Sequence, residues 1–138
     1  MKNKLPMCLA LLGGLLAFRG SMFAHHGSAA YETKVAEMKD ATVTKFVWSN
    51  PHAIVFFEVK DDNGNVVHWA AEIGSPPAVS VLGWTRTSLQ PGDVVTVYVW
   101  PAKSGRSVGR MNRVVFPDGR TLRDSQLGGG QGEGKEEK

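Results

Sequence analysis

Short apolar segments alternate with turn residues along the middle of the chain, between residues 41 and 116. The segments are rich in β-branched and aromatic residues or alternate apolar with polar positions, and both patterns are typical of β-strands. Turn-forming sequences separate them: Asn63-Gly64, for example, supplies residues that accept the positive φ of a tight hairpin. We therefore predict five strands, at Ala41–Ser49, Ala53–Lys60, Val66–Ile73, Val94–Trp100 and Ser107–Phe116.

The segment between the third and fourth of these strands has a helix signature. Ser75 can cap a helix, and Pro76 or Pro77 suits its first turn, so we expect a short helix that reaches about Gly83. This order of elements predicts an all-β fold, a small five-stranded OB-like barrel with one short helix between strands 3 and 4. A β-sandwich fragment or another small barrel is the alternative, but barrel closure solves the problem of exposed strand edges better.

Alternation along the third strand assigns its two faces. The apolar face is expected in the core and comprises Val67, Trp69, Ala71 and Ile73. His68 and Glu72 then point outward, four residues apart, and Phe56 of the second strand is an outward aromatic beside them. The outer face of these two strands is a common ligand platform in OB barrels. We favour the plainer interpretation, in which the N-terminal arm or the C-terminal tail covers Phe56.

The first 24 residues have the order of a secretory signal peptide. Lys2 and Lys4 precede an apolar stretch at residues 5–18, and Ala24 suits the last position before cleavage, although Met22 stands where a small residue is preferred. The apolar stretch is shorter than the roughly 20 residues of a spanning helix, so a membrane anchor or a core helix is the weaker alternative. We expect cleavage after Ala24, a periplasmic or secreted protein, and no transmembrane segment after processing.

Processing divides the remaining chain into three parts. We expect an N-terminal arm at residues 25–40, the barrel domain at residues 41–123 and a flexible Gly/Glu/Lys tail at residues 124–138. Cys8 is the only cysteine and lies in the signal, so the mature chain can form no disulfide and no thiolate metal site.

Processing also cancels the apparent basic charge. The whole chain has a formal charge of +3, but the signal holds Lys2, Lys4 and Arg19, which leaves 13 basic against 13 acidic residues. A footprint for phosphate backbones is therefore absent, and we expect no nucleic-acid partner.

All four histidines follow the expected cleavage point: His25, His26, His52 and His68. An N-terminal His25 would offer its α-amine and a ring nitrogen to one metal ion, and His52 or His68 could complete a three-nitrogen site suited to copper, or bind zinc. Glu72 or Glu32 could add an oxygen ligand. The alternative is that all four are ordinary solvated histidines at a frayed terminus, in a loop and on the surface.

Six short motifs occur in an order and spacing that resemble a family of small exported bacterial proteins known only as a domain of unknown function. They begin at His25, Trp48, Glu72, Gly83, Pro91 and Pro117 and read HH, WSNPH, EIGSP, GWTR, PGD and PDGR. The resemblance implies a periplasmic or secreted Gram-negative protein and no established activity. It therefore assigns no catalytic residue.

Two functions follow as hypotheses. The first is an exported barrel that binds a metal ion or a small ligand, with Asn50, Phe56, Glu72 and Trp84 as candidate ligand or interaction residues. The alternative is a structural or interaction protein of the cell envelope with no metal and an envelope protein as its partner. An enzyme is least favoured, because Ser75 lies in no nucleophile elbow and no local pattern supplies a base and an orienting group.

Overall fold

The computed structural model describes residues 29–125 and contains six strands and one short helix in that range. The elements, in chain order, are β1 (Ala36–Val47), β2 (Ile54–Lys60), β3 (Val66–Glu72), α2 (Pro76–Ser80), β4 (Val94–Pro101), β5 (Val108–Val115) and β6 (Thr121–Arg123). The five predicted strands and the helix between the third and fourth strands are all present.

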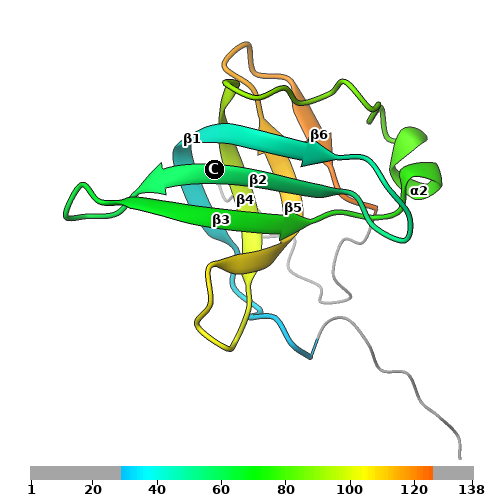
Figure 1. Ribbon diagram of the computed structural model, residues 1–138. Helices are drawn as coiled ribbons and strands as arrows, with labels where there is room; N and C mark the ends of the chain where they lie inside the picture. The colour runs from blue at the N-terminus through cyan, green and yellow to red at the C-terminus, as the bar shows by residue number, and fades with distance from the viewer. Residues whose placement is uncertain (1–28, 126–138) are drawn as a thin grey trace, which may run out of the picture.

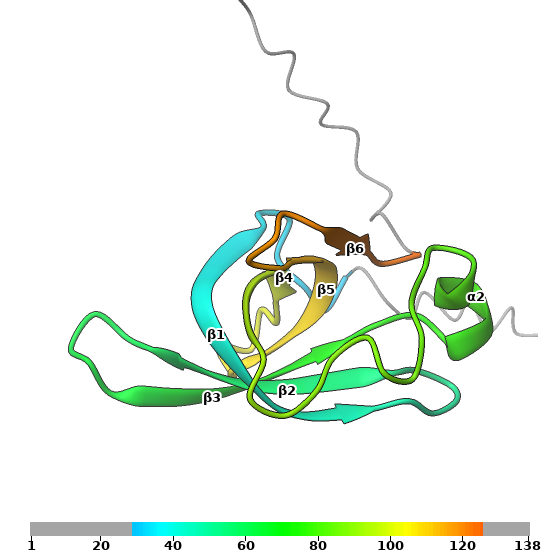
Figure 2. The same cartoon turned by 90° about the horizontal axis from the view of Figure 1, so that it is seen from above.

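The first five strands close into a barrel (Figures 1 and 2). β1 pairs antiparallel with both β2 and β4, β2 pairs with β3, and β4 pairs with β5. A parallel pairing of β3 with the first residues of β5 closes the ring, and β6 pairs antiparallel with the last residues of β5, Arg113–Val115. The predicted all-β, five-stranded barrel is therefore confirmed, with β6 as an extra strand.

β1 is longer than the predicted first strand and begins at Ala36, inside the segment expected to be an N-terminal arm. Its register shifts twice, between Met38 and Ala41 and between Val43 and Lys45. Such bulges bend a strand, which lets β1 pair with β4 through its first half and with β2 through its second. Glu37, Lys39 and Asp40 are exposed polar residues around the half-buried Ala36 and Met38, and they conceal this first half in the sequence.

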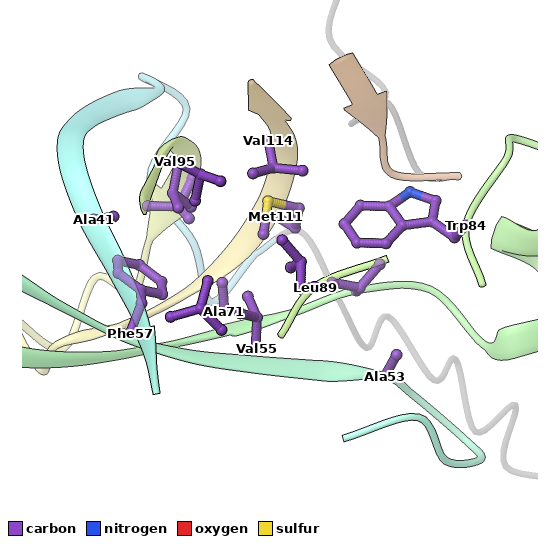
Figure 3. Close-up of a cluster of buried hydrophobic side chains, with 14 of the residues drawn as sticks. Ala41, Ala53, Val55, Phe57, Ala71, Trp84, Leu89, Val95, Met111 and Val114 are labelled. Atoms are coloured by element: carbon purple, nitrogen blue, oxygen red, sulfur yellow. The ribbon is translucent and has the colours of Figure 1, made fainter. Parts of the chain in front are cut away.

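The core fills the barrel and continues to the end that faces α2 (Figure 3). Ala71 of β3 and Ile73, directly after β3, are fully buried, as predicted, whereas Val67 and Trp69 are half-buried. Val67 and Trp69 lie nearer the hairpin turn than residues 70–72, which pair with β5. In Figure 2 the β2–β3 ribbon extends beyond the other strands toward that turn. Trp69 stacks on Phe57 there, with ring centroids 6.5 Å apart.

Trp84 fills the end of the barrel beside α2. It is 1% exposed, and its Nε1–H donates a 2.7 Å hydrogen bond to the carbonyl oxygen of Arg123. α2 itself ends at Ser80 rather than near Gly83, because turn hydrogen bonds follow it and Gly83 takes φ +94°. Trp84 therefore closes this end of the barrel from inside, and its N–H is hydrogen-bonded. Its buried side chain presents no surface to a partner.

Candidate functional site

A row of residues crosses the outer face of the barrel where β3 ends. Strand register places Ile54 of β2 beside Glu72 of β3, Glu72 beside Arg110 of β5, and Arg110 beside Trp100 of β4. Directly opposed residues in a sheet point to the same face. The closing pairing of β3 with β5 therefore brings Glu72 and Arg110 together although 38 residues separate them.

Glu72 lies at the centre of this row and contacts two basic side chains through one oxygen. Its Oε1 accepts a 3.0 Å hydrogen bond from Nη1 of Arg110 and is also in contact with Nδ1 of His52, in the loop before β2. The side chains of His52 and Glu72 are 42% and 33% exposed, so this part of the site faces solvent.

Arg110 is held from its other side by a buried carboxylate. Its Nε–H donates a 2.8 Å hydrogen bond to Oδ2 of Asp124, whose side chain is fully buried. Oδ1 of Asp124 accepts 2.7 Å hydrogen bonds from the backbone N–H groups of Gly74 and Ser125. Among residues 29–125, only Nη2 of Arg110 is a buried side-chain polar atom with no hydrogen-bond partner. We call His52, Glu72, Arg110 and Asp124 the four-residue network.

Gly74 is required where the chain leaves β3. A Cβ at this position would lie 2.3 Å from Oγ of Ser125, 3.0 Å from Cγ1 of Val79 and 3.1 Å from Oδ1 of Asp124. Because glycine has no Cβ, the carboxylate of Asp124 can approach closely enough to accept a hydrogen bond from the backbone N–H of Gly74.

Tyr31 brings the N-terminal segment next to the network. Burial raises the pKa of its phenol above the ordinary 10.0, the negative charge of Glu72 raises this pKa further, and the positive charge of Arg110 lowers it. The backbone around Tyr31 is attached to the link between β4 and β5: it forms a bridge with Ala102, and Lys103 N–H donates a 3.0 Å hydrogen bond to the carbonyl of Ala30. Tyr31 therefore lies near enough to Glu72 and Arg110 for their charges to act on its phenol.

Of the four predicted metal-ligating histidines, the structure describes two, His52 and His68, and it does not bring them together. His68 contacts Glu58 instead of Glu72, with 3.2 Å between Nδ1 and Oε1, and its side chain is 77% exposed. His68 and Glu72 are four positions apart on β3, or about 13 Å at 3.3 Å per residue, so His52 and His68 belong to separate pairs. His25 and His26 lie outside the described residues. Residues 29–125 hold no group of three His, Cys, Asp or Glu side chains that could bind a metal.

The predicted interaction residues differ in their surroundings. Asn50 is exposed in the loop between β1 and β2. Phe56 is half-buried, with the Lys45 ammonium 6.0 Å from its ring centroid. Arg110, Asp124 and Tyr31 were not among the sequence candidates. No local pattern singled out Arg110, because Asn112 and Arg113 of the same strand are also polar. The predicted start of the tail at residue 124 concealed the buried Asp124.

Comparison with known proteins gives one match. The model of a family of unknown function, DUF6152, matches residues 14–112. The chain belongs to this family. No curated protein and no solved structure matched it. The matched range includes His52, Glu72 and Arg110 and ends before Asp124. Within the described residues of this family member, no helix is long and apolar enough to cross a membrane.

Proposed function

We propose that this DUF6152 protein is an exported barrel that binds one metal ion, copper or zinc, through His52 and the histidine exposed at its mature N-terminus. The observation that supports this is the pairing of His52 with a carboxylate that is itself held in place. Histidines that bind metals almost always donate their other ring N–H to a carboxylate, a carbonyl or water, which fixes the orientation of the ring. Glu72 stands in this relation to Nδ1 of His52.

With Nδ1 directed at Glu72, the metal-binding atom of His52 is Nε2. The side chain of His52 is 42% exposed, which supports access of an ion to this ring from solvent. One imidazole does not hold an ion firmly, and the remaining ligands must come from outside residues 29–125.

The N-terminal segment is the source we propose for those ligands. Ala30 is fixed to the link between β4 and β5, and His25 lies five residues upstream of it. Five residues span at most about 17 Å when extended. The charge of Glu72 acts on the Tyr31 phenol, and this supports our proposal that His25 reaches His52. After cleavage, the α-amine and ring of His25 and Nε2 of His52 would form a three-nitrogen site, a donor set that suits copper and zinc.

The test is calorimetric titration of the mature chain, beginning at His25, with Cu(II) and Zn(II). We expect His52→Ala to weaken binding by at least about tenfold to 100-fold, the range found for disturbed metal sites, and the matched control His68→Ala to leave it nearly unchanged. A glycine added before His25 removes the free amine of the histidine and should weaken binding similarly. Binding no tighter than that of a His-His-Gly peptide, or equal effects of the two alanine variants, would contradict the proposal.

Export is part of the same proposal and has its own test. Mass spectrometry of protein secreted or recovered from periplasm should give a chain that begins at His25. A different first residue would remove the amine–imidazole ligand but not the role of His52.

The alternative is an envelope interaction protein without a metal. Val81 and Leu82, directly after α2, are 84% and 44% exposed and form a small apolar surface. This alternative predicts that Val81→Ser with Leu82→Ser abolishes co-purification of a stoichiometric envelope partner and leaves metal titrations flat in every variant.

A further inference from the structure

The four-residue network indicates how the proposed metal site would select its ion. We infer that Arg110 and Asp124 are positioning residues that hold Glu72 as the partner of His52 and keep its carboxylate from binding the metal directly, so that the ion is bound by nitrogen atoms. This inference rests on the proposed function for its metal, while its structural part can be tested without one.

The position of Glu72 makes it a candidate oxygen ligand, since carboxylates bind both hard cations and zinc. Its Oε1 is already shared between Nη1 of Arg110 and Nδ1 of His52. A carboxylate whose charge is offset by a guanidinium is a weaker donor to a cation than a free one. The role of Glu72 in the network is then to accept a hydrogen bond from the imidazole of His52.

Arg110 cannot readily turn away from Glu72. Its side chain is only 10% exposed, and its Nε is bonded to a carboxylate, that of Asp124, with no exposure at all. Two backbone N–H groups fix that carboxylate in turn.

The consequence is selectivity. A site with nitrogen donors favours Cu(II), followed by zinc, and disfavours Mg²⁺, Ca²⁺ and Mn²⁺, which require oxygen ligands. The second pair, His68 with Glu58, has no arginine contact among the described residues. Glu58 therefore lacks the restraint that Arg110 places on Glu72, and the pair of His68 with Glu58 serves as an internal comparison.

The first experiment needs no metal. Nitrogen NMR of the neutral imidazoles distinguishes a proton on Nδ1 from one on Nε2. We expect His52 to carry it on Nδ1 in the native chain and to shift toward Nε2 in the double variant Arg110→Met with Asp124→Asn, which removes both buried charges together. His68 should keep its tautomer in both proteins. A proton on Nε2 of His52 in the native protein would overturn the inference.

The second experiment uses Cu(II) and the variant Glu72→Gln, which keeps a side-chain oxygen for His52 and leaves Arg110 paired with Asp124. We expect about tenfold to 100-fold weaker binding with an unchanged electron paramagnetic resonance spectrum, because the atoms bound to copper stay the same. A spectrum that changes with this variant would identify Glu72 as a ligand and overturn the inference. Glu58→Gln is the control and should change neither quantity.

The outcomes separate the two proposals. If the native chain binds no metal but His52 carries its proton on Nδ1, the proposed function fails and the positioning role of Arg110 and Asp124 stands. If the metal binds and the NMR result is reversed, the metal site stands and the positioning role fails. The double variant must keep the native near-ultraviolet circular dichroism. If it does not, the test uses Arg110→Lys, which retains a cation beside Glu72, and His52 should then carry its proton on Nδ1. A folded Arg110→Lys protein in which His52 does not do so counts against the inference.

Discussion

His52 and His68 each place Nδ1 beside a glutamate at opposite ends of β3, yet the two pairs are built differently. Glu58 meets His68 on an open part of the β2–β3 ribbon near the hairpin, where the histidine side chain is 77% exposed. Glu72 meets His52 at the barrel end, where the closing pairing with β5 puts Arg110 and then Asp124 behind the carboxylate. The same two residue types therefore have different freedom of movement.

The difference shows that the support behind a pair matters more than the pair itself. An exposed ion pair is screened by water and contributes about 0–1 kcal/mol. A pair backed by a buried arginine and a buried carboxylate is fixed, because moving either of these would leave an unpaired charge in the protein interior. A histidine on such support can be oriented for a ligand, whereas the pair of His68 with Glu58 has no such backing among the described residues.

The largest effect should come from breaking this support. Arg110→Met removes the partner of the fully buried carboxylate of Asp124, and loss of one member of a buried pair costs about 3–5 kcal/mol. Urea denaturation should show this loss in the free energy of unfolding. The matched control is Arg113→Met on the same strand, whose guanidinium stacks 3.6 Å from the half-exposed Tyr98 ring, with an expected cost of about 1 kcal/mol. Equal costs would mean that the buried pair gives no special support.

The next effect concerns Gly74, whose backbone N–H donates a hydrogen bond to Asp124. Gly74→Ala forces a Cβ against Ser125, Val79 and the Asp124 carboxylate, and we expect about 1–3 kcal/mol of destabilisation by overpacking. Gly64→Ala, in the hairpin near His68, meets no atom within 4 Å and costs about 1–2 kcal/mol through its φ of +82° alone. Only Gly74→Ala should also weaken Cu(II) binding; an equal loss of binding in both variants would contradict the comparison.

The fold followed from the sequence more completely than the site did. Alternating segments and the Asn63-Gly64 turn predicted the β2–β3 hairpin, and the helix signature after Gly74 predicted the OB-type order. The first half of β1 was missed because the charged residues Glu37, Lys39 and Asp40 surround its half-buried Ala36 and Met38. Local patterns predict elements well when a single strand carries its own alternation.

The site depends on contacts that no local pattern encodes. His52 and Glu72 were both named as candidates, but the bond from Arg110 to Glu72 spans 38 positions and that from Gly74 to Asp124 spans 50. These contacts exist only after β3 and β5 pair in parallel and the chain turns back through β6. Arg110 and Asp124 therefore could not be recognised before the barrel was closed.

A smaller effect should separate the two glutamates. Glu72→Gln removes the charge that Arg110 faces and should cost about 1 kcal/mol, since the carboxylate is one-third exposed and screened. Glu58→Gln should stay within about 0.5 kcal/mol. Thermal unfolding of the two variants against the native chain measures the difference, and an order in which Glu58→Gln costs more would reverse the comparison.

The smallest effect is a shift in the ionisation of Tyr31, and it tests the geometry of the site directly. In a Tyr98→Phe background Tyr31 is the only tyrosine, so phenolate absorbance reports it alone. Burial and then the charge of Glu72 raise the pKa of Tyr31 above 10.0, so we expect Glu72→Gln to lower this pKa and Glu58→Gln to leave it unchanged. Because the pKa is raised in the folded state, the stability that Tyr31 contributes is fully present below about pH 10 and is lost as the pH rises through the folded pKa. An identical response to the two glutamate variants would mean that Tyr31, and with it the start of the N-terminal segment, does not lie beside the network.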